Sequence, residues 1–222
     1  HAGRTTRQSS GRLTAAADFG VMPTKTTGTN SMRLLGKMSG YEVEYLPNLS
    51  FRLMSFVISI RDVFFPVGKR LDRFGICQGS VVVDFGCGPG SYLERASQLA
   101  GNAGKVYAVD VHPFAIMSVK RGAKQKNLGN VVAVLSTGYP VDIESQSADV
   151  IYALDMFHHV KDTNGFLTEL HRLLKPHDFL FIESGHQPLD VARKKILKSD
   201  CWVVIKEEKN LFECKRKEHG SA

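Results

Sequence analysis

Short runs of apolar and β-branched residues alternate with longer amphipathic stretches through most of the chain. The short runs lie at residues 80–84, 105–110, 130–135, 148–153 and 178–183. Apolar residues recur at helical spacing in residues 90–100, 113–127, 163–174 and 188–198. Strands that are separated by helices form a parallel sheet with helices on both faces. The pattern therefore predicts an α/β fold, a three-layer sandwich around a mostly parallel sheet.

The end of the chain breaks this alternation. The runs "CWVVIKEE" and "LFECKRK" are separated only by Lys209 and Asn210. So short a connection joins antiparallel neighbours, because a parallel pair needs a crossover of about a dozen residues or more. We therefore predict a C-terminal antiparallel hairpin that closes one edge of a seven-stranded sheet.

The N-terminal part of the chain has a different character. Residues 1–31 are rich in Ser, Thr, Gly and Arg, so we expect a flexible leader, with a transit peptide or a vector-derived tag as alternatives. Apolar residues recur at near-helical spacing from 49 to 65, which predicts an amphipathic helix that Pro66 ends. We assign 32–66 to an N-terminal helical segment and 67–217 to the main domain, which opens with a short helix at "VGKRLDRFGI".

Composition and charge exclude several classes of protein. The chain of 222 residues is 43% hydrophobic, which is typical of a globular domain. No window approaches the roughly 18 consecutive apolar residues of a membrane span, so we expect a soluble protein. The four cysteines form no CxxC pair, which argues against a disulfide framework or a metal site and favours the reducing cytoplasm.

The net charge of +7 is concentrated at the N-terminus. Residues 1–40 contain six basic residues and one acidic residue, a charge of +5, which leaves +2 for the remainder of the chain. A main domain so close to neutral gives no strong signal for a polyanion. Nucleic acid is therefore a partner that we keep but do not favour.

The stretch "VVVDFGCGPGSY" carries the first chemical signal. A glycine-rich turn between a strand and a helix lets the backbone approach a ligand closely and presents N–H groups to a negative charge. Gly86, Gly88 and Gly90 have the spacing G-x-G-x-G, whereas a dinucleotide pyrophosphate is bound by G-x-G-x-x-G. Asp84 would repel a pyrophosphate, but it suits the ammonium group of an amino-acid tail. The loop therefore favours a ligand with such a tail.

A second acid stands at the tip of the next predicted strand, "KVYAVD", which ends at Asp110. A carboxylate there can accept hydrogen bonds from both hydroxyls of a ribose. Together with "VVVDFGCGPGSYLERAS", "ADVIYALDMFHHVKD" and "LHRLLKPHDFLFIES", this strand resembles the successive motifs of class I S-adenosylmethionine-dependent methyltransferases. The resemblance is greatest to the broad subgroup that includes quinone-biosynthesis enzymes, and it covers about residues 67–217.

The resemblance implies a Rossmann-like fold, S-adenosylmethionine as cofactor, and methyl transfer by direct in-line displacement that leaves S-adenosylhomocysteine. It also implies a set of cofactor-binding positions. For the methionine portion they are Asp84, Gly86, Cys87, Gly88 and Gly90; for the ribose and adenine edge, Asp110 and Val111; for the adenine end, Thr137 and Gly138; and for the floor near the sulfonium, Ala153, Leu154 and Asp155. Relatives usually show an acid after the third strand, where this chain reads "LSTGYPVD", so Thr137 and Asp142 are alternative partners for the adenine amino group.

Other positions can be interpreted either as structural residues or as residues with a chemical role. A neutral imidazole at His159 or His158 could take a proton from the acceptor, although in the family this pair often only shapes the pocket. The family has a small residue or Cys without a chemical role at the position of Cys87, so we expect that side chain to pack. N-terminal helices of the family commonly cover the cofactor, and the resemblance therefore gives 32–66 the role of a lid.

The acceptor has three interpretations. We expect a small molecule, with apolar or aromatic compounds as one candidate class, because the 49–65 segment is aromatic and the main domain is near neutral. The alternative enzyme is an RNA or protein methyltransferase that uses the basic leader and the basic residues in "ARKKILK". A third interpretation is a non-catalytic module that binds the cofactor as a scaffold.

Overall fold

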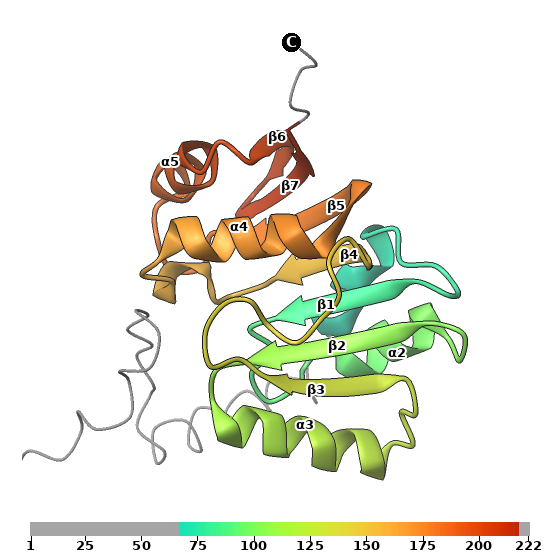
Figure 1. The fold of residues 1–222 in the computed structure, drawn as a ribbon. Coiled ribbons are helices and arrows are strands. Elements are labelled where there is room, and N and C mark those ends of the chain that lie inside the picture. The colour runs from blue at the N-terminus through green and yellow to red at the C-terminus, as the bar shows by residue number, and fades with distance from the viewer. Residues whose placement is uncertain (1–66, 218–222) are drawn as a thin grey trace, which may run out of the picture. The chain divides into compact units, whose positions relative to one another are not determined.

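The computed structural model describes residues 67–217, whose fold is drawn in Figure 1. A seven-stranded sheet with the order β3-β2-β1-β4-β5-β7-β6 forms its centre. The strands are β1 (Val81–Phe85), β2 (Lys105–Asp110), β3 (Val131–Leu135), β4 (Ala148–Ala153), β5 (Leu174–Glu183), β6 (Trp202–Glu208) and β7 (Leu211–Arg216). The helices are η1 (Val67–Arg73), α2 (Leu93–Ala100), α3 (Pro113–Gln125), η2 (Phe157–His159), α4 (Thr163–Leu173) and α5 (Leu189–Lys198).

The direction of the strands confirms the predicted fold class. Strands β1 to β5 pair in parallel, whereas β7 is antiparallel to both β5 and β6. The predicted C-terminal hairpin is therefore present, and it forms one edge of the sheet (Figure 1).

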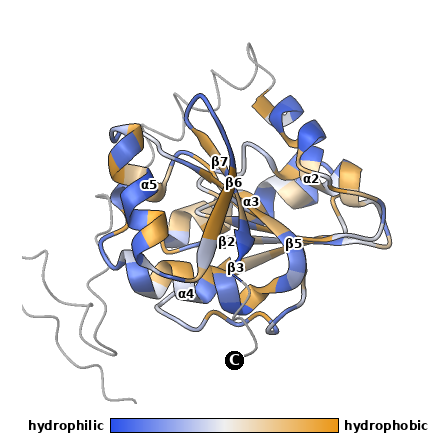
Figure 2. Ribbon diagram, turned by 90° about the horizontal axis from the view of Figure 1, so that it is seen from above, coloured by the Kyte–Doolittle hydropathy of each residue, from blue (hydrophilic) through white to orange (hydrophobic). Residues whose placement is uncertain are grey.

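Two hydrophobic cores fill the two faces of the sheet because successive strand residues point to opposite sides. On β1, Val83 belongs to the core that is covered by α4 and α5. Its neighbour Val82 belongs to the core that is covered by η1, α2 and α3. Figure 2 shows the result as orange strands between helices that are partly blue. The sheet is thus covered on both faces, as its apolar strands require.

Two predicted boundaries are wrong by three residues or more. Helix α2 begins at Leu93 rather than at 90, because Gly90 has φ 96° and cannot lie inside a right-handed helix. Strand β5 begins at Leu174, directly after α4, rather than at 178; it pairs there with Ala148 before a register shift. The short helix predicted at the start of the main domain is present, as a 3₁₀ helix that ends at Arg73.

Some predictions lie outside the described residues. They are the leader at 1–31, the helix at 49–65 and the lid role of 32–66, which stay predictions. In residues 67–217, every helix is too short or too polar to cross a membrane.

Candidate functional site

The loop between β1 and α2 is fastened to the neighbouring strand β2. The N–H groups of Gly86 and Cys87 both donate to the Val109 carbonyl, at 2.8 and 3.0 Å. The N–H of Gly88 donates to Asp110 Oδ2 at 2.8 Å. These backbone donors, which the sequence offered to a ligand, are thus used within the protein. A ligand can therefore approach only the open side of the loop, which faces away from β2 and is not covered by other atoms.

That open side is at Gly88. Gly86 and Gly88 have φ values of 87° and 51°, a region that residues with a side chain rarely adopt. A Cβ added at Gly86 would lie 2.6 Å from Cγ of Met156, whereas one added at Gly88 would meet nothing within 4 Å. Gly86 is therefore required by close packing, and Gly88 is a point where a ligand can approach the backbone.

Asp84 lies under this loop and is only 2% exposed. It faces Tyr152 across the parallel pair of β1 and β4, where the two residues are register partners. Among the described residues, neither Asp84 Oδ2 nor the Tyr152 hydroxyl has a hydrogen-bond partner of good geometry. Burial raises the pKa of Asp84 to about 8, an effect that the nearby Tyr152 hydroxyl offsets in part. A buried carboxylate of this kind is stabilised by a cation.

Asp110, at the end of β2, joins two loops. Its Oδ2 accepts the hydrogen bond from Gly88, and its Oδ1 accepts one from the His112 N–H at 2.8 Å. Burial raises the pKa of Asp110, and these backbone hydrogen bonds oppose that rise. Each carboxylate oxygen can accept two hydrogen bonds, so both retain capacity for a ligand. Val111, beside it, is half-buried.

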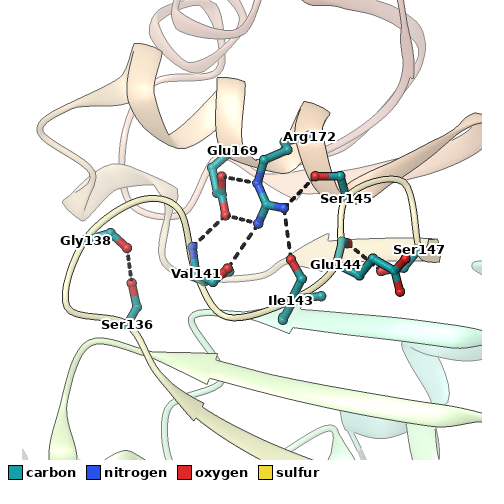
Figure 3. Close-up of polar contacts among 9 residues, drawn as sticks. All are labelled: Ser136, Gly138, Val141, Ile143, Glu144, Ser145, Ser147, Glu169 and Arg172. Atoms are coloured by element: carbon teal, nitrogen blue, oxygen red, sulfur yellow. Dashed lines mark hydrogen bonds and ion pairs between the residues drawn. The ribbon is translucent and has the colours of Figure 1, made fainter.

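Thr137 and Gly138 lie in the loop between β3 and β4, close to the backbone of Asp110. The N–H of Ser136 donates to the Asp110 carbonyl at 2.9 Å. Ser136 Oγ donates to the Gly138 carbonyl at 3.2 Å, a contact that is drawn in Figure 3. The side chain of Thr137 is exposed. The structure thus brings the start of this loop to the predicted ribose position, while Asp142 follows further along it with an exposed side chain.

The predicted floor residues lie where β4 ends. Ala153 and Leu154 are buried, and Asp155 is exposed with φ 57°. Carboxyl ends of parallel strands meet at one edge of a sheet, so these residues share that edge with Asp84 and Asp110.

Three histidines gather at the same edge. The ring centroids of His158 and His159 are 3.9 Å apart, and those of His158 and His186 are 4.9 Å apart. His186 Nε2 lies 3.8 Å from an Asp155 carboxylate oxygen. Burial and the neighbouring His159 and His186 lower the pKa of His158 below its usual 6.5, and its Nδ1 is buried beside Gly185. His159 has the exposed ring of the pair.

Cys87 is buried among core residues. Burial raises the pKa of its thiol well above the ordinary value, so the reactive thiolate is disfavoured. This environment agrees with the packing role that we predicted for Cys87.

Sequence reasoning missed several residues at this edge. His186 follows β5, and the rule that parallel strands end together could have indicated it. Arg70 donates to Glu183 at 3.0 Å and to the Tyr92 hydroxyl at 3.4 Å, and Asn210 donates to the same Glu183 carboxylate at 2.5 Å. No motif indicated this second group, because its members come from distant parts of the sequence.

Within the described part of the chain, no group of three or more His, Cys, Asp or Glu side chains is arranged to hold a metal ion.

Comparisons with known proteins give the same family as the motifs. Residues 83–182 match a family model described as a methyltransferase domain. The sterol 24-C-methyltransferase of Eremothecium gossypii is 28% identical over 105 residues, which cover 47% of this chain and 28% of that protein. Aklanonic acid methyltransferase of a Streptomyces species is 27% identical over 142 residues, which cover 58% of this chain and 64% of that protein.

A solved structure has the same fold. It is a SAM-dependent methyltransferase from Aquifex aeolicus with a TM-score of 0.63 and 25% identity, covering 77% of this chain and 97% of that one. The chain spans less than two thirds of the two curated relatives, 28% and 64% of their lengths. Their similarity is thus to a methyltransferase domain rather than to the whole of either relative. Domain match, shared fold and motif order agree, and together they support a class I S-adenosylmethionine-dependent methyltransferase.

Proposed function

We propose that this protein transfers a methyl group from S-adenosylmethionine to a small-molecule acceptor. The observation that carries the proposal is Asp84, a buried carboxylate whose Oδ2 has no hydrogen-bond partner of good geometry among residues 67–217. It lies under a glycine loop that is open at Gly88. The ammonium group of the cofactor's methionine portion is a cation of the kind that such a carboxylate needs.

The remaining cofactor residues follow from the same arrangement. Asp110 can accept the ribose hydroxyls while it keeps its two backbone hydrogen bonds. The backbone at Gly88 lies along the methionine portion. We assign the other predicted positions to the loop under the methionine portion, the adenine end and the floor: Gly86, Cys87, Gly90, Val111, Thr137, Gly138, Ala153, Leu154 and Asp155.

The cofactor supplies a methyl group that is already activated on a sulfonium sulfur. The residues of the chain therefore need to bind, orient and exclude water, and no nucleophilic side chain is required. Where the acceptor carries a proton, we propose that the exposed imidazole of His159 takes it. His158 packs against Gly185 and supports the ring of His159.

A small-molecule acceptor has two lines of support. The two relatives described above are named for small molecules, a sterol and aklanonic acid. Three of the four basic residues in "ARKKILK", the segment considered as an RNA face, have partners within the protein: Arg193 pairs with Glu207, Lys194 with Asp190, and Lys195 with Gln187. Paired charges contribute less to the binding of a polyanion than free ones.

Calorimetry with S-adenosylmethionine, S-adenosylhomocysteine and NAD tests the cofactor. We expect the first two to bind and NAD not to bind; binding of NAD in their place would refute the proposal. Methyl-labelled cofactor incubated with fractionated cell extract then tests the acceptor. We expect label in a small molecule, whereas label in RNA or protein would favour the alternative enzyme, and no transfer would favour the scaffold.

A further inference from the structure

Helix α4 holds the loop between β3 and β4 through two side chains, Glu169 and Arg172 (Figure 3). Glu169 is 4% exposed. Its Oε1 accepts hydrogen bonds from the Val141 N–H at 2.8 Å and from Arg172 Nη2 at 2.7 Å. Its Oε2 accepts one from Arg172 Nε at 2.9 Å. The carboxylate thus binds the loop directly and orients the guanidinium.

Arg172 spreads its remaining hydrogen bonds over the same loop. Nη2 donates to the Val141 carbonyl at 3.1 Å, and Nη1 donates to the Ile143 carbonyl at 2.9 Å and to Ser145 Oγ at 2.8 Å. Both backbone polar groups of Val141 are therefore bound by this pair. The side chains of Val141 and Ile143 are buried in the core, so the second half of the loop is fixed on both sides.

The first half of the loop is fixed at its start. The Ser136 N–H binds the carbonyl of Asp110, the residue that we propose for the ribose. Residues 137–140 are thus a four-residue segment with an anchor at each end, Ser136 and Val141. A segment so short and so held has few conformations left to it. It contains Thr137 and Gly138, which we propose for the adenine end.

The Glu169 side chain is 4% exposed and the Arg172 side chain is 28% exposed, and a partly buried ion pair of this kind contributes little to stability by itself. Apolar residues of the same volume often stabilise a protein as well or better, whereas charged hydrogen bonds fix geometry. Val141 and Ile143 already bind the loop to the core through apolar contacts. What Glu169 and Arg172 add is therefore the position of the loop backbone.

We propose that Glu169 and Arg172 are positioning residues for adenine recognition: they hold residues 137–140 where the loop distinguishes adenine from other bases. This inference rests on the proposed function. Neither side chain is expected to touch the cofactor, because both are occupied by the loop and by each other.

The test compares the affinity of the protein for S-adenosylhomocysteine with its affinity for S-inosylhomocysteine. S-inosylhomocysteine differs from S-adenosylhomocysteine in carrying an oxo group where adenine has its amino group. Calorimetry on the wild-type chain should show a preference for S-adenosylhomocysteine. Arg172→Lys keeps the charge but cannot make all the contacts of the guanidinium, and we expect it to reduce that preference about fivefold. Thermal melting checks that the variant is folded.

Arg216→Lys is the matched control. Arg216 also lies against α4 and donates to a backbone carbonyl, that of Leu174 at 3.0 Å, but it has no hydrogen bond to the loop. We expect the preference of Arg216→Lys for S-adenosylhomocysteine over S-inosylhomocysteine to stay within about twofold of the wild-type preference. Glu169→Gln is a second test variant, which keeps the side-chain shape and weakens the same contacts.

The outcomes separate this inference from the proposed function. If the wild-type chain binds neither ligand, the proposed function fails. If it binds both but folded Arg172→Lys and Glu169→Gln keep the full preference, the positioning role is refuted. An equal loss of affinity for the two ligands would make the pair merely structural, and would also refute it.

Discussion

The buried carboxylate of Asp84, which we propose for cofactor binding, lowers the stability of the ligand-free protein when it is charged. Its pKa in the folded protein is about 8, compared with an ordinary value of 3.8, mainly because of burial. Between these two pH values the folded chain keeps a proton that the unfolded chain has released. The contribution to stability is therefore fully present below pH 3.8 and is lost as the pH rises through about 8. The ligand-free protein accordingly becomes less stable toward neutral and alkaline pH.

Asp84→Asn should remove this dependence. Because Asn has no charge to bury, the variant should gain on the order of a few kcal/mol in unfolding free energy at pH 8.5 relative to the wild type. It should also bind S-adenosylmethionine at least about tenfold more weakly. Urea unfolding at pH 5 and 8.5 measures the first effect, and calorimetry measures the second.

Asp190→Asn is the control for this prediction, since Asp190 is an exposed residue that pairs with Lys194 on the surface of α5. It should leave the pH dependence of stability unchanged. A wild-type pH dependence in Asp84→Asn would contradict the burial argument.

The second prediction at the scale of single residues concerns His159. If it takes the acceptor proton, His159→Ala should lower turnover about a hundredfold while affinity for S-adenosylhomocysteine is unchanged. Turnover is measured with labelled cofactor and the acceptor identified in extract. Unaltered turnover would dismiss the role. His158→Ala provides a comparison, because it removes the ring that packs beside His159 and should lower turnover less.

Individual site residues differed in how far the sequence could predict them. Asp84, Gly88 and Asp110 stand in a local motif, so the chain order itself places them together. Tyr152 lies beside Asp84 only because β1 and β4 are neighbours in a given register. A register between strands so far apart in sequence has no local signal, and the position of Tyr152 beside Asp84 could therefore not be predicted.

At the scale of elements, two glycines of the loop between β1 and α2 have different roles: Gly86 packs against Met156, whereas we propose that Gly88 contacts the cofactor. Gly86→Ala would place a Cβ against Met156 and should both destabilise the fold and weaken binding. Gly88→Ala meets no atom, so we expect only the backbone cost of about 1–2 kcal/mol at a positive φ. If the open side of Gly88 receives the cofactor, this folded variant should still bind it at least about tenfold more weakly.

Thermal melting and calorimetry on both variants distinguish the two roles. Gly122→Ala is a control in α3, where an added Cβ also meets nothing and the backbone is helical. It should retain both stability and affinity. Wild-type affinity in Gly88→Ala would exclude the loop from the binding surface.

Elements were predictable where apolar periodicity alone determines them. The strands and the hairpin followed from short apolar runs and a two-residue connection. The start of α2 did not, because the sequence does not show that the loop stays in left-handed conformations as far as Gly90. The early start of β5 depends on its pairing with Ala148, a contact between distant residues.

At the scale of the whole described molecule, a partly buried ion pair joins the first helix, η1, to the end of β5. Arg70 in η1 and Glu183 at the end of β5 are 113 residues apart, and Asn210 in the hairpin turn and Tyr92 before α2 bind the same pair. The side chain of Glu183 is 8% exposed and that of Arg70 is 32% exposed. Removal of one partner thus leaves a poorly solvated charge.

A double-mutant cycle measures what this link contributes. Arg70→Met should cost about 3 kcal/mol of unfolding free energy, because the Glu183 carboxylate is then buried without its cation. Adding Glu183→Gln should restore part of that loss, giving a coupling energy above about 1 kcal/mol. The exposed pair of Arg73 and Glu208 also joins η1 to the hairpin, with 51% and 41% exposure, and should couple by less than about 1 kcal/mol. Equal coupling in the two pairs would show that burial does not strengthen the link between Arg70 and Glu183.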